Sequence, residues 1–239
     1  MVLLFRVVAP LLFAAAAAGA AAGDKYSPSV PQLAVANLRV EYFHDPLAVA
    51  TQTPRFSWEL PAGLDRGVRQ MSYQITVVRL HSDFAPLWSS GVVDSNATHG
   101  IVCNHTLPAN TRYQAIVRWM ATSDGSLSAP AVANFGVGPM EAKDWGGAHW
   151  IGSEGQRQIR GSFTLNATLN VEFAVLHVAA PGCSVVTVNG KLVDSGVGIC
   201  TWTQFQHTVL YSTLDVGGAL VPGENVIGLL LGHSVFGDR

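Results

Sequence analysis

Short runs of alternating apolar and polar residues recur along the first half of the chain. Residues 37–42, 55–60 and 73–77 alternate cleanly, and residues 113–120 do so less regularly. A period of two places the apolar side chains on one face of a β-strand, and no stretch here has a sustained helical period. The turns between these strands are predicted at Gly63, Gly91, Pro108 and Asp124-Gly125. The pattern therefore predicts an antiparallel β-sandwich of roughly 100 residues that ends near residue 137.

A second group of strand-like runs follows Trp145. The segment Val171 to Val178 is mostly apolar, which indicates a central strand buried on both faces. Asn189-Gly190 is a strong hairpin signal, because both turn positions must adopt positive φ. The other predicted strands are 161–165, 184–188, 191–193, 205–211 and 226–231. These runs predict a second all-β unit, which we interpret as a jelly roll.

Residues 1–22 predict a secretory signal peptide. Arg6 supplies a positive charge, Val7 to Ala18 is an apolar stretch, and the small residues 19–23 offer a cleavage site. A membrane anchor is the alternative, but the run is short and rich in Ala, which contributes little insertion energy. No later segment is long and apolar enough to span a bilayer. We therefore expect a secreted, extracellular protein with no membrane partner.

Sequons and cysteines are consistent with secretion. Candidate N-glycosylation sites occur at Asn96, Asn104 and Asn166, each followed two residues later by Thr. Cys183 and Cys200 are close enough in sequence for a disulfide across a hairpin, which an oxidising compartment would permit. Cys103 is left over, and we expect a buried thiol. No CxxC-like metal-binding spacing is present, so no metal site is predicted.

The charge pattern excludes one class of partner. The formal net charge is −2, and no run of Lys or Arg occurs anywhere in the chain. Nucleic acids and anionic membranes need concentrated positive charge for binding. We therefore expect no nucleic-acid partner.

Particular motifs suggest which β-sandwiches these are. Leu107 to Tyr113 reads LPANTRY, which resembles the L-x-P-x-T-x-Y corner of fibronectin type III domains with the Pro one place early. In that corner the Tyr hydroxyl bonds back to upstream backbone. Trp58 would be the core aromatic residue of the same sandwich. The predicted fold is all-β, a fibronectin type III-like β-sandwich followed by a jelly-roll-like β-sandwich.

The order of several further motifs resembles the N-terminal region of bacterial-type α-L-rhamnosidases. The first module contributes LRVEY at 38–42, DPL at 45–47, PRFSW at 54–58, RQMSYQI at 69–75 and LWSSG at 87–91; the second contributes WIG at 150–152, VNGK at 188–191 and GENVIG at 223–228. The resemblance implies a fibronectin type III-like domain over residues 33–139 and the rhamnosidase N-terminal jelly roll over residues 147–239. It also implies a C-terminal helical catalytic domain, which is missing here.

One stretch departs from the family pattern. Residues 232–237 read GHSVFG where the family tends to have a sequence like GDGWY. Any ligand contact that the family makes at this position is therefore in doubt for this chain.

The expected function follows from the resemblance. The family hydrolyses terminal α-L-rhamnose from glycans or glycosides, and this chain would be an accessory part of such an enzyme, with a rhamnose-containing carbohydrate as its partner. Glycoside hydrolysis needs two opposed carboxyl groups, whereas many acidic residues here fall in predicted turns. We assign no catalytic residue and expect the isolated chain to be inactive.

Two non-catalytic alternatives remain open. A stand-alone carbohydrate-binding module would use Asp194 and Trp202, with Ca²⁺ as a possible bridging ion and no other cofactor. A turn acid and a packed aromatic residue are the structural readings of the same two positions. The other alternative is an adhesive β-sandwich protein with no sugar-binding role.

Overall fold

The computed structural model describes residues 2–6, 34–80, 85–121, 125, 127–152, 157–166, 168, 171, 173–193 and 199–232. The chain divides into two compact units, Leu11–Met140 and Glu141–Arg239 together with Met1–Pro10. We call them the first and the second module. Within the described residues the regular structure is antiparallel β-strand, with two short 3₁₀ helices and no α-helix. The all-β fold class is thereby confirmed.

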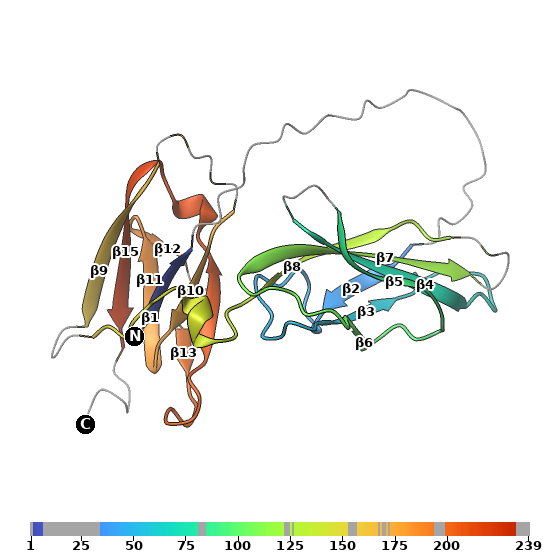
Figure 1. The fold of residues 1–239 in the computed structure, drawn as a ribbon, viewed down its shortest axis with the longest axis horizontal. Coiled ribbons are helices and arrows are strands. Elements are labelled where there is room, and N and C mark those ends of the chain that lie inside the picture. The colour runs from blue at the N-terminus through green and yellow to red at the C-terminus, as the bar shows by residue number, and fades with distance from the viewer. Residues whose placement is uncertain are drawn as a thin grey trace. The chain divides into compact units, whose positions relative to one another are not determined.

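The first module contains two sheets, drawn in blue to green in Figure 1. One has the order β2-β3-β6, with β2 at Ala36–Val40, β3 at Arg55–Glu59 and β6 at Ile101–Val102. The other has the order β5-β4-β7-β8, with β5 at Pro86–Asp94, β4 at Gln70–Arg79, β7 at Thr111–Ala121 and β8 at Ala131–Val137. Apolar side chains from both sheets form a single core.

Large aromatic residues fill that core. Phe56, Tyr113, Trp119 and Phe135 are fully buried, and Trp58 is nearly so. The Trp58 indole N–H donates to Gln70 Oε1 at 3.0 Å, so its polar atom is satisfied inside the sandwich. The prediction that Trp58 is a core residue is confirmed.

The predicted tyrosine corner is also present. The Tyr113 hydroxyl donates a 2.8 Å hydrogen bond to the carbonyl of Pro108, five residues upstream. The displaced Pro therefore leaves the bond intact. Burial raises the pKa of the Tyr113 phenol, so the group remains a hydrogen-bond donor.

One turn prediction in the first module is wrong. Gly91 lies inside strand β5, with φ of 62°, and not between strands. The pairing of β4 with β5 shifts register between Gln74 and Thr76, beside this residue. Gly91 therefore accommodates an irregularity within a strand. Turns and strand irregularities both use positive φ, which glycine adopts easily, so a glycine alone does not distinguish them.

The second module also contains two sheets. One has the order β1-β10-β14, with β1 at Val2–Arg6, β10 at Val175–Ala179 and β14 at Tyr211–Asp215. The other has the order β12-β11-β15-β9, and β13 at Ile199–Thr201 also pairs with β11. Its strands are β12 at Lys191–Leu192, β11 at Gly182–Val188, β15 at Gly223–Leu231 and β9 at Gln158–Leu165. The 3₁₀ helices are η1 at Ala142–Trp145 and η2 at Gly217–Ala219.

The core of the second module is mainly aliphatic. Leu176 and Val178 of β10 pack with Val186 and Val188 of β11 and with Ile227 of β15. The predicted hairpin at Asn189-Gly190 is confirmed, since both residues have positive φ and Val188 pairs with Lys191. The predicted central strand is shorter than expected, because β10 begins at Val175.

The strand predicted over 205–211 is wrong for all but its last residue. The backbone N–H groups of His207 and Thr208 both donate to the carbonyl of Gln204, at 2.8 and 3.0 Å, which closes a turn. Strand β14 begins only at Tyr211. The local turn takes the backbone hydrogen bonds that a strand would have used.

The predicted signal peptide lies largely outside the described residues. The part of it that the structure describes is Val2–Arg6, which forms β1 and pairs with β10 over five residues. Cleavage of residues 1–22 remains a prediction. None of the helices in the described part of the chain has the length and hydropathy needed to cross a bilayer.

Candidate functional site

The most exposed aromatic side chain in the described part of the second module is Trp202, with 74% of its surface accessible. It begins a loop, residues 202–210, that joins β13 to β14; we call this the Trp202 loop. The ring of Phe205 lies beside it, with 6.5 Å between ring centroids and 51° between ring planes. Two neighbouring aromatic rings are thus displayed on one loop.

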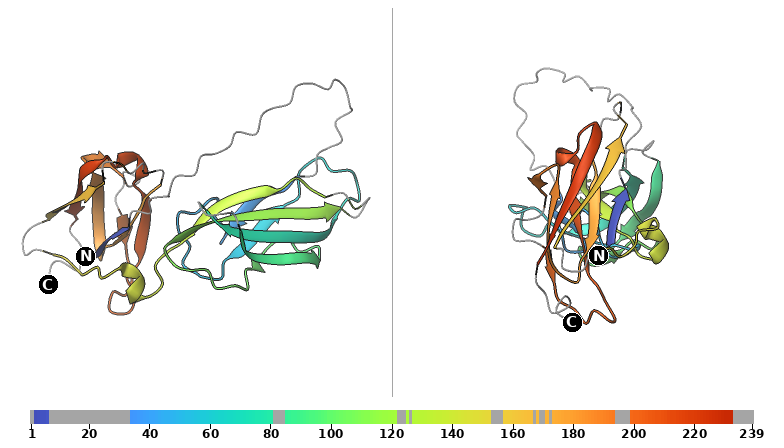
Figure 2. Two further views of the ribbon diagram at one scale, coloured as in Figure 1. Left: turned by 45° about the horizontal axis from the view of Figure 1, so that its top comes forward. Right: turned by 90° about the vertical axis from the view of Figure 1, so that its left-hand side faces the viewer.

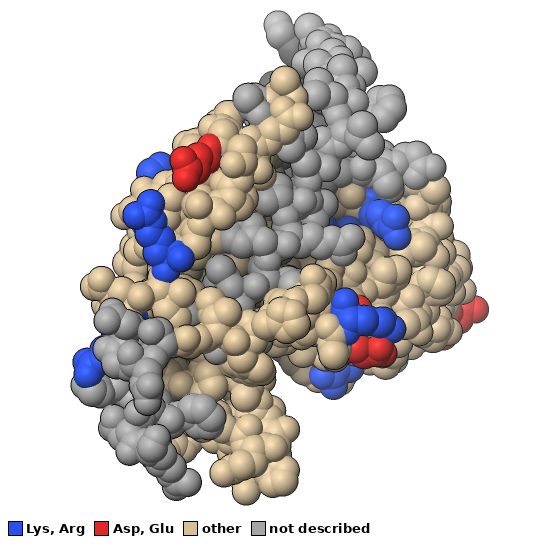
Figure 3. Space-filling view, turned by 60° about the vertical axis from the view of Figure 1, so that its left-hand side comes forward, with Lys and Arg blue, Asp and Glu red and all other residues tan. Residues whose placement is uncertain are grey.

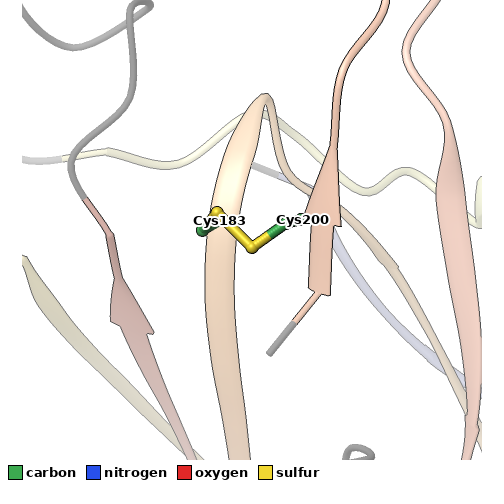
Figure 4. Close-up of a disulfide and its surroundings, with 2 residues drawn as sticks. All are labelled: Cys183 and Cys200. Atoms are coloured by element: carbon green, nitrogen blue, oxygen red, sulfur yellow. A yellow bond between two sulfur atoms is a disulfide. The ribbon is translucent and has the colours of Figure 1, made fainter. Parts of the chain in front are cut away.

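A disulfide fixes the start of this loop. Cys183 of β11 and Cys200 of β13 lie directly opposite each other in the strand pairing and are joined by a disulfide, as Figure 4 shows. Trp202 follows Cys200 by two residues. Within the loop, the Thr203 hydroxyl donates to the carbonyl of Thr208, next to the turn at Gln204. Covalent and hydrogen-bonded constraints therefore hold the segment that carries Trp202.

The chemistry of the Trp202 loop suits a neutral, hydroxyl-rich ligand. Gln204, Gln206 and His207 are exposed and place hydrogen-bonding groups on the same loop as the two aromatic rings. A sugar ring presents an apolar C–H face and a polar rim, which match an aromatic surface flanked by amides. Asp194, the second predicted sugar contact, lies outside the described residues. Among the described residues, no three His, Cys, Asp or Glu side chains form a group that could hold a metal ion.

The three predicted glycosylation sites are all exposed asparagines. The Asn104 Oδ1 atom accepts a 2.6 Å hydrogen bond from the Trp88 indole. The Asn166 Oδ1 atom accepts from the backbone N–H and the hydroxyl of Thr168, at 3.1 and 3.0 Å. In both residues these bonds use the oxygen and not the amide nitrogen to which a glycan would be attached.

Cys103 is fully buried as a free thiol. Burial raises its pKa, which disfavours the reactive thiolate. The Sγ atom lies 3.5 Å from the carbonyl of His105 and donates to it. The chemistry of this cysteine is that of a core residue.

Several carboxylates among the described residues form hydrogen bonds or ion pairs within the protein. Asp45 accepts from the backbone N–H of Asn134 at 2.6 Å, and Asp215 accepts from that of Gly217 at 3.0 Å. Glu141 forms an ion pair with Lys143 at 2.7 Å. On the face drawn in Figure 3, charged residues of both signs stand in small separate groups on a largely uncharged surface. Asp45 and Asp215 thus act as acceptors for backbone N–H groups, and Glu141 forms an exposed ion pair.

No sequence pattern indicated the buried His177, whose ring forms a cluster with two aromatic rings that also contact each other. His177 of β10 is 4% exposed, and its ring lies 6.4 Å from Trp145 and 5.7 Å from Tyr211, each in edge-to-face geometry. Its Nδ1 atom lies 2.8 Å from the Thr213 hydroxyl. Burial lowers the pKa of His177 to about 4, so the imidazole is neutral near pH 7.

Motifs on which the family resemblance rests contact each other through their side chains. In the first module, Glu41 and Arg55 form a bidentate ion pair with contacts of 2.6 and 3.2 Å. Burial acts to raise the pKa of Glu41, but the hydrogen bonds and charge of Arg55 outweigh it and lower the pKa. In the second module, Asn189 donates to Asn225 Oδ1 at 2.8 Å. Each pair joins two segments that are distant in sequence.

Comparison with known proteins agrees with this architecture. Residues 35–141 match the family described as the Rha78A-like, N-terminal immunoglobulin domain, and residues 169–239 match the alpha-L-rhamnosidase N-terminal domain. An alpha-L-rhamnosidase of Formosa agariphila is 28% identical over 211 residues, covering 79% of this chain and 22% of the relative. The chain thus spans less than a quarter of that relative's length.

Solved structures show the same relationship. The alpha-L-rhamnosidase from Dictyoglumus thermophilum superposes with a TM-score of 0.72 at 25% identity, covering 84% of this chain and 25% of that one. The native enzyme from Aspergillus terreus shares the fold, with a TM-score of 0.67 at 19% identity, over 84% of this chain and 24% of that one. The two domain matches, in this order, show that the chain corresponds to the N-terminal region of α-L-rhamnosidases, an immunoglobulin domain followed by the alpha-L-rhamnosidase N-terminal domain.

Proposed function

We propose that this chain is the accessory, non-catalytic N-terminal part of a secreted α-L-rhamnosidase-type glycoside hydrolase. In this role the two β-sandwich modules support and present a catalytic domain that removes terminal α-L-rhamnose from glycans or glycosides. The observation that carries the proposal is the ordered pair of domain matches in a chain that covers 22–25% of each relative described above. The structural roles of Asp45, Asp215 and Glu141 are consistent with it.

An activity measurement tests the non-catalytic part of this proposal. The purified chain is incubated with p-nitrophenyl α-L-rhamnoside, and nitrophenol release is followed by absorbance. We expect no release above the rate in buffer. Release that scales with protein concentration and persists through a second purification would show that these two modules contain a catalytic site.

The Trp202 loop supports a second function, binding of a rhamnose-containing carbohydrate. The observation in its favour is the 74% exposure of Trp202 beside Phe205 on a loop held by the disulfide. Burial of so large an aromatic ring against a sugar face would contribute to binding. A Ca²⁺ ion would take part only if Asp194 lies near this loop.

Calorimetric titration with L-rhamnose, with and without Ca²⁺, tests the binding function. We expect heat of binding in the intact chain and its loss in Trp202→Ala. Trp150→Ala is the matched control, because Trp150 is also exposed, at 56%, but lies outside the loop. Equal binding by both variants would remove the Trp202 loop from consideration. An absence of binding by every form would favour the adhesive alternative.

Secretion and glycosylation are tested together. We expect the protein secreted from a eukaryotic host to start near residue 23 and to lose mass on enzymatic removal of N-glycans. Asn96→Gln, Asn104→Gln and Asn166→Gln would each remove one glycan. An intact Met1 in the secreted protein, or an unchanged mass after deglycosylation, would contradict these two parts of the proposal.

A further inference from the structure

Asn189 stands directly before Gly190, and no other asparagine in the chain is followed by glycine. Asparagine is among the thermolabile residue types, because its side-chain amide can react with the next backbone nitrogen. A following glycine favours this reaction, since it has no side chain to shield that nitrogen and its backbone adopts many conformations. The hairpin turn between β11 and β12 therefore carries a reactive pair of residues.

The reaction of this pair is a cyclisation followed by hydrolysis. The backbone nitrogen of Gly190 attacks Cγ of Asn189, so that a new N–C bond forms and the bond from Cγ to Nδ2 breaks. Nδ2 leaves as ammonia and takes the proton that the Gly190 nitrogen gives up. Water then opens the resulting succinimide ring at either of its bonds to that nitrogen, which leaves aspartate in the normal or the isoaspartate linkage. Water is the only co-reactant.

In the folded module the Asn189 side chain is held by other partners. Its Nδ2 atom donates to the carbonyl of Ala219 at 2.9 Å and to Asn225 Oδ1 at 2.8 Å, and its Oδ1 atom accepts from the backbone N–H of Val226 at 2.8 Å. Strands β11 and β15, orange and red in Figure 1 and Figure 2, are paired side by side, which places these partners next to the turn. Ring closure onto Gly190 would require the side chain to leave all of them.

The product of the reaction does not fit the same contacts. An ionised carboxylate accepts hydrogen bonds and donates none, so at position 189 it would face the Ala219 carbonyl and Asn225 Oδ1 with an oxygen in place of a donor. Asn225 is fully buried, and water would not relieve this repulsion. Isoaspartate would also lengthen the backbone of a tight turn in which Val188 pairs with Lys191. The modified turn is therefore expected not to close again.

From these contacts we propose that Asn189 is a conditional deamidation site. The hydrogen bonds to Ala219, Asn225 and Val226 keep it unreactive in the folded module, and opening of the turn exposes it to attack by Gly190. Each reaction removes the amide that closes the turn, so the change runs in one direction. The second module thus accumulates damage in proportion to the time that this turn is open. The inference is independent of the proposed roles in secretion and sugar binding.

Peptide mapping by mass spectrometry measures the reaction directly. The full chain is kept in mildly alkaline buffer with and without denaturing urea, and the asparagine, aspartate and isoaspartate forms at position 189 are quantified over time. In urea we expect Asn189 to react faster than every other asparagine of the chain. In buffer we expect it to react about tenfold more slowly than in urea, or slower still, because the turn has to open first. Equal rates in the folded and unfolded chain would overturn the proposal.

A variant separates the effect of these hydrogen bonds from that of overall stability. Asn225→Ala removes one partner of the Asn189 side chain, and the parent protein in enough urea to match the variant's unfolding free energy is the reference. At matched stability we expect the variant to deamidate at least about threefold faster at Asn189. Gly136→Ala, which creates an overlap with the Leu47 carbonyl in the first module, should leave the rate unchanged. Equal rates in Asn225→Ala and its reference would remove the role given to the hydrogen bonds.

Hydrogen exchange gives the same test without a variant, and it applies even if Asn225→Ala does not fold. The backbone amide of Val226 donates to Asn189 Oδ1, so its exchange reports the opening of that bond. Over a series of low urea concentrations we expect deamidation at Asn189 to rise in proportion to exchange at Val226. Deamidation that proceeds while the Val226 amide stays protected would overturn the proposal.

The one-way character of the change has its own test. Asn189→Asp places the carboxylate of the product in the turn, and Asn96→Asp makes the same change at an exposed asparagine of the first module. We expect Asn189→Asp to lower the unfolding temperature of the second module and Asn96→Asp to leave both modules unchanged. An Asn189→Asp protein as stable as its parent would show that the deamidated turn can close, against the proposal.

Discussion

The side-chain amide of Asn189 donates to the side-chain carbonyl of Asn225 at 2.8 Å, joining a hairpin turn to the start of β15. Asn225 is fully buried. Its amide nitrogen also donates to the carbonyls of Val221 and Gly223, and its oxygen accepts from the backbone N–H of Val221. One asparagine thus satisfies several polar groups that have little access to water.

Replacement of Asn225 by Ala should therefore destabilise the second module strongly. Each buried polar group left without a partner costs about 1–3 kcal/mol, so we expect a loss of about 3 kcal/mol or more in the free energy of unfolding. Urea unfolding measures this loss. Glu224→Ala, at the exposed neighbouring position, should change stability by less than about 0.5 kcal/mol. Similar losses in both variants would mean that the Asn225 network is not what holds this turn.

Gly136 of β8 is predicted to tolerate no side chain. A Cβ atom at this position would lie 2.1 Å from the backbone carbonyl oxygen of Leu47, which crosses the strand there. Backbone has to move to relieve such an overlap, so Gly136→Ala should cost about 1–3 kcal/mol or more, as in overpacked cores. Gly161→Ala, on strand β9 with open space around it, is the control. Thermal unfolding of both variants checks the prediction, and an unchanged melting temperature for Gly136→Ala would contradict it.

Loss of the disulfide should destabilise the second module. Cys183 and Cys200 are 17 residues apart, and a cross-link closing a loop of that size lowers the entropy of the unfolded chain by an amount worth about 3 kcal/mol. We expect a decrease of this order in unfolding free energy on reduction by dithiothreitol. The double variant Cys183→Ala/Cys200→Ala should show no further response to reductant. A persistent response would implicate another thiol.

Acid should destabilise the fold through His177 when β1 is in place. The folded pKa of about 4 lies below the ordinary value of 6.5, so the unfolded chain takes up the proton first as pH falls. The stability is fully present above pH 6.5, declines as pH falls toward 4, and is lower by about 3 kcal/mol once both states are protonated. Unfolding free energies measured from pH 7.5 to 4 check this. His177→Gln should flatten the dependence over that window, and an unchanged slope in the variant would assign it to other groups.

The alternation of apolar and polar residues was enough to predict the fold class because each sandwich buries one face of each sheet. It located β3, β4 and β7 well, since most of their apolar residues face the core of the first module, with Met71 of β4 among the exceptions. It failed at Gly91, where positive φ serves a strand irregularity, and over 205–210, where Gln204 closes a turn. The local pattern does not show whether a glycine lies in a turn or inside a strand, or whether a run of alternating residues forms a strand or a turn.

The candidate site was less predictable for a different reason. The disulfide beside Trp202 was predicted from the sequence but the turn at Gln204 was not, and the residue types around Trp202 did not decide between an exposed and a packed ring. The contacts of His177 with Trp145 and Tyr211 join residues more than thirty positions apart with no characteristic spacing. The pairing of β1 with β10 joins segments more than 160 positions apart. Such contacts are set by topology and not by neighbouring residues.

No residue belongs to both hydrophobic clusters in the described part of the chain, since one cluster is formed by residues 38–137 and the other by residues 174–229. Each module therefore carries its own source of folding free energy. A calorimeter would record this as two heat-absorption peaks, each of which shifts only with mutations in its own cluster. The consequence is that a destabilising change in one cluster acts first on the module that contains it.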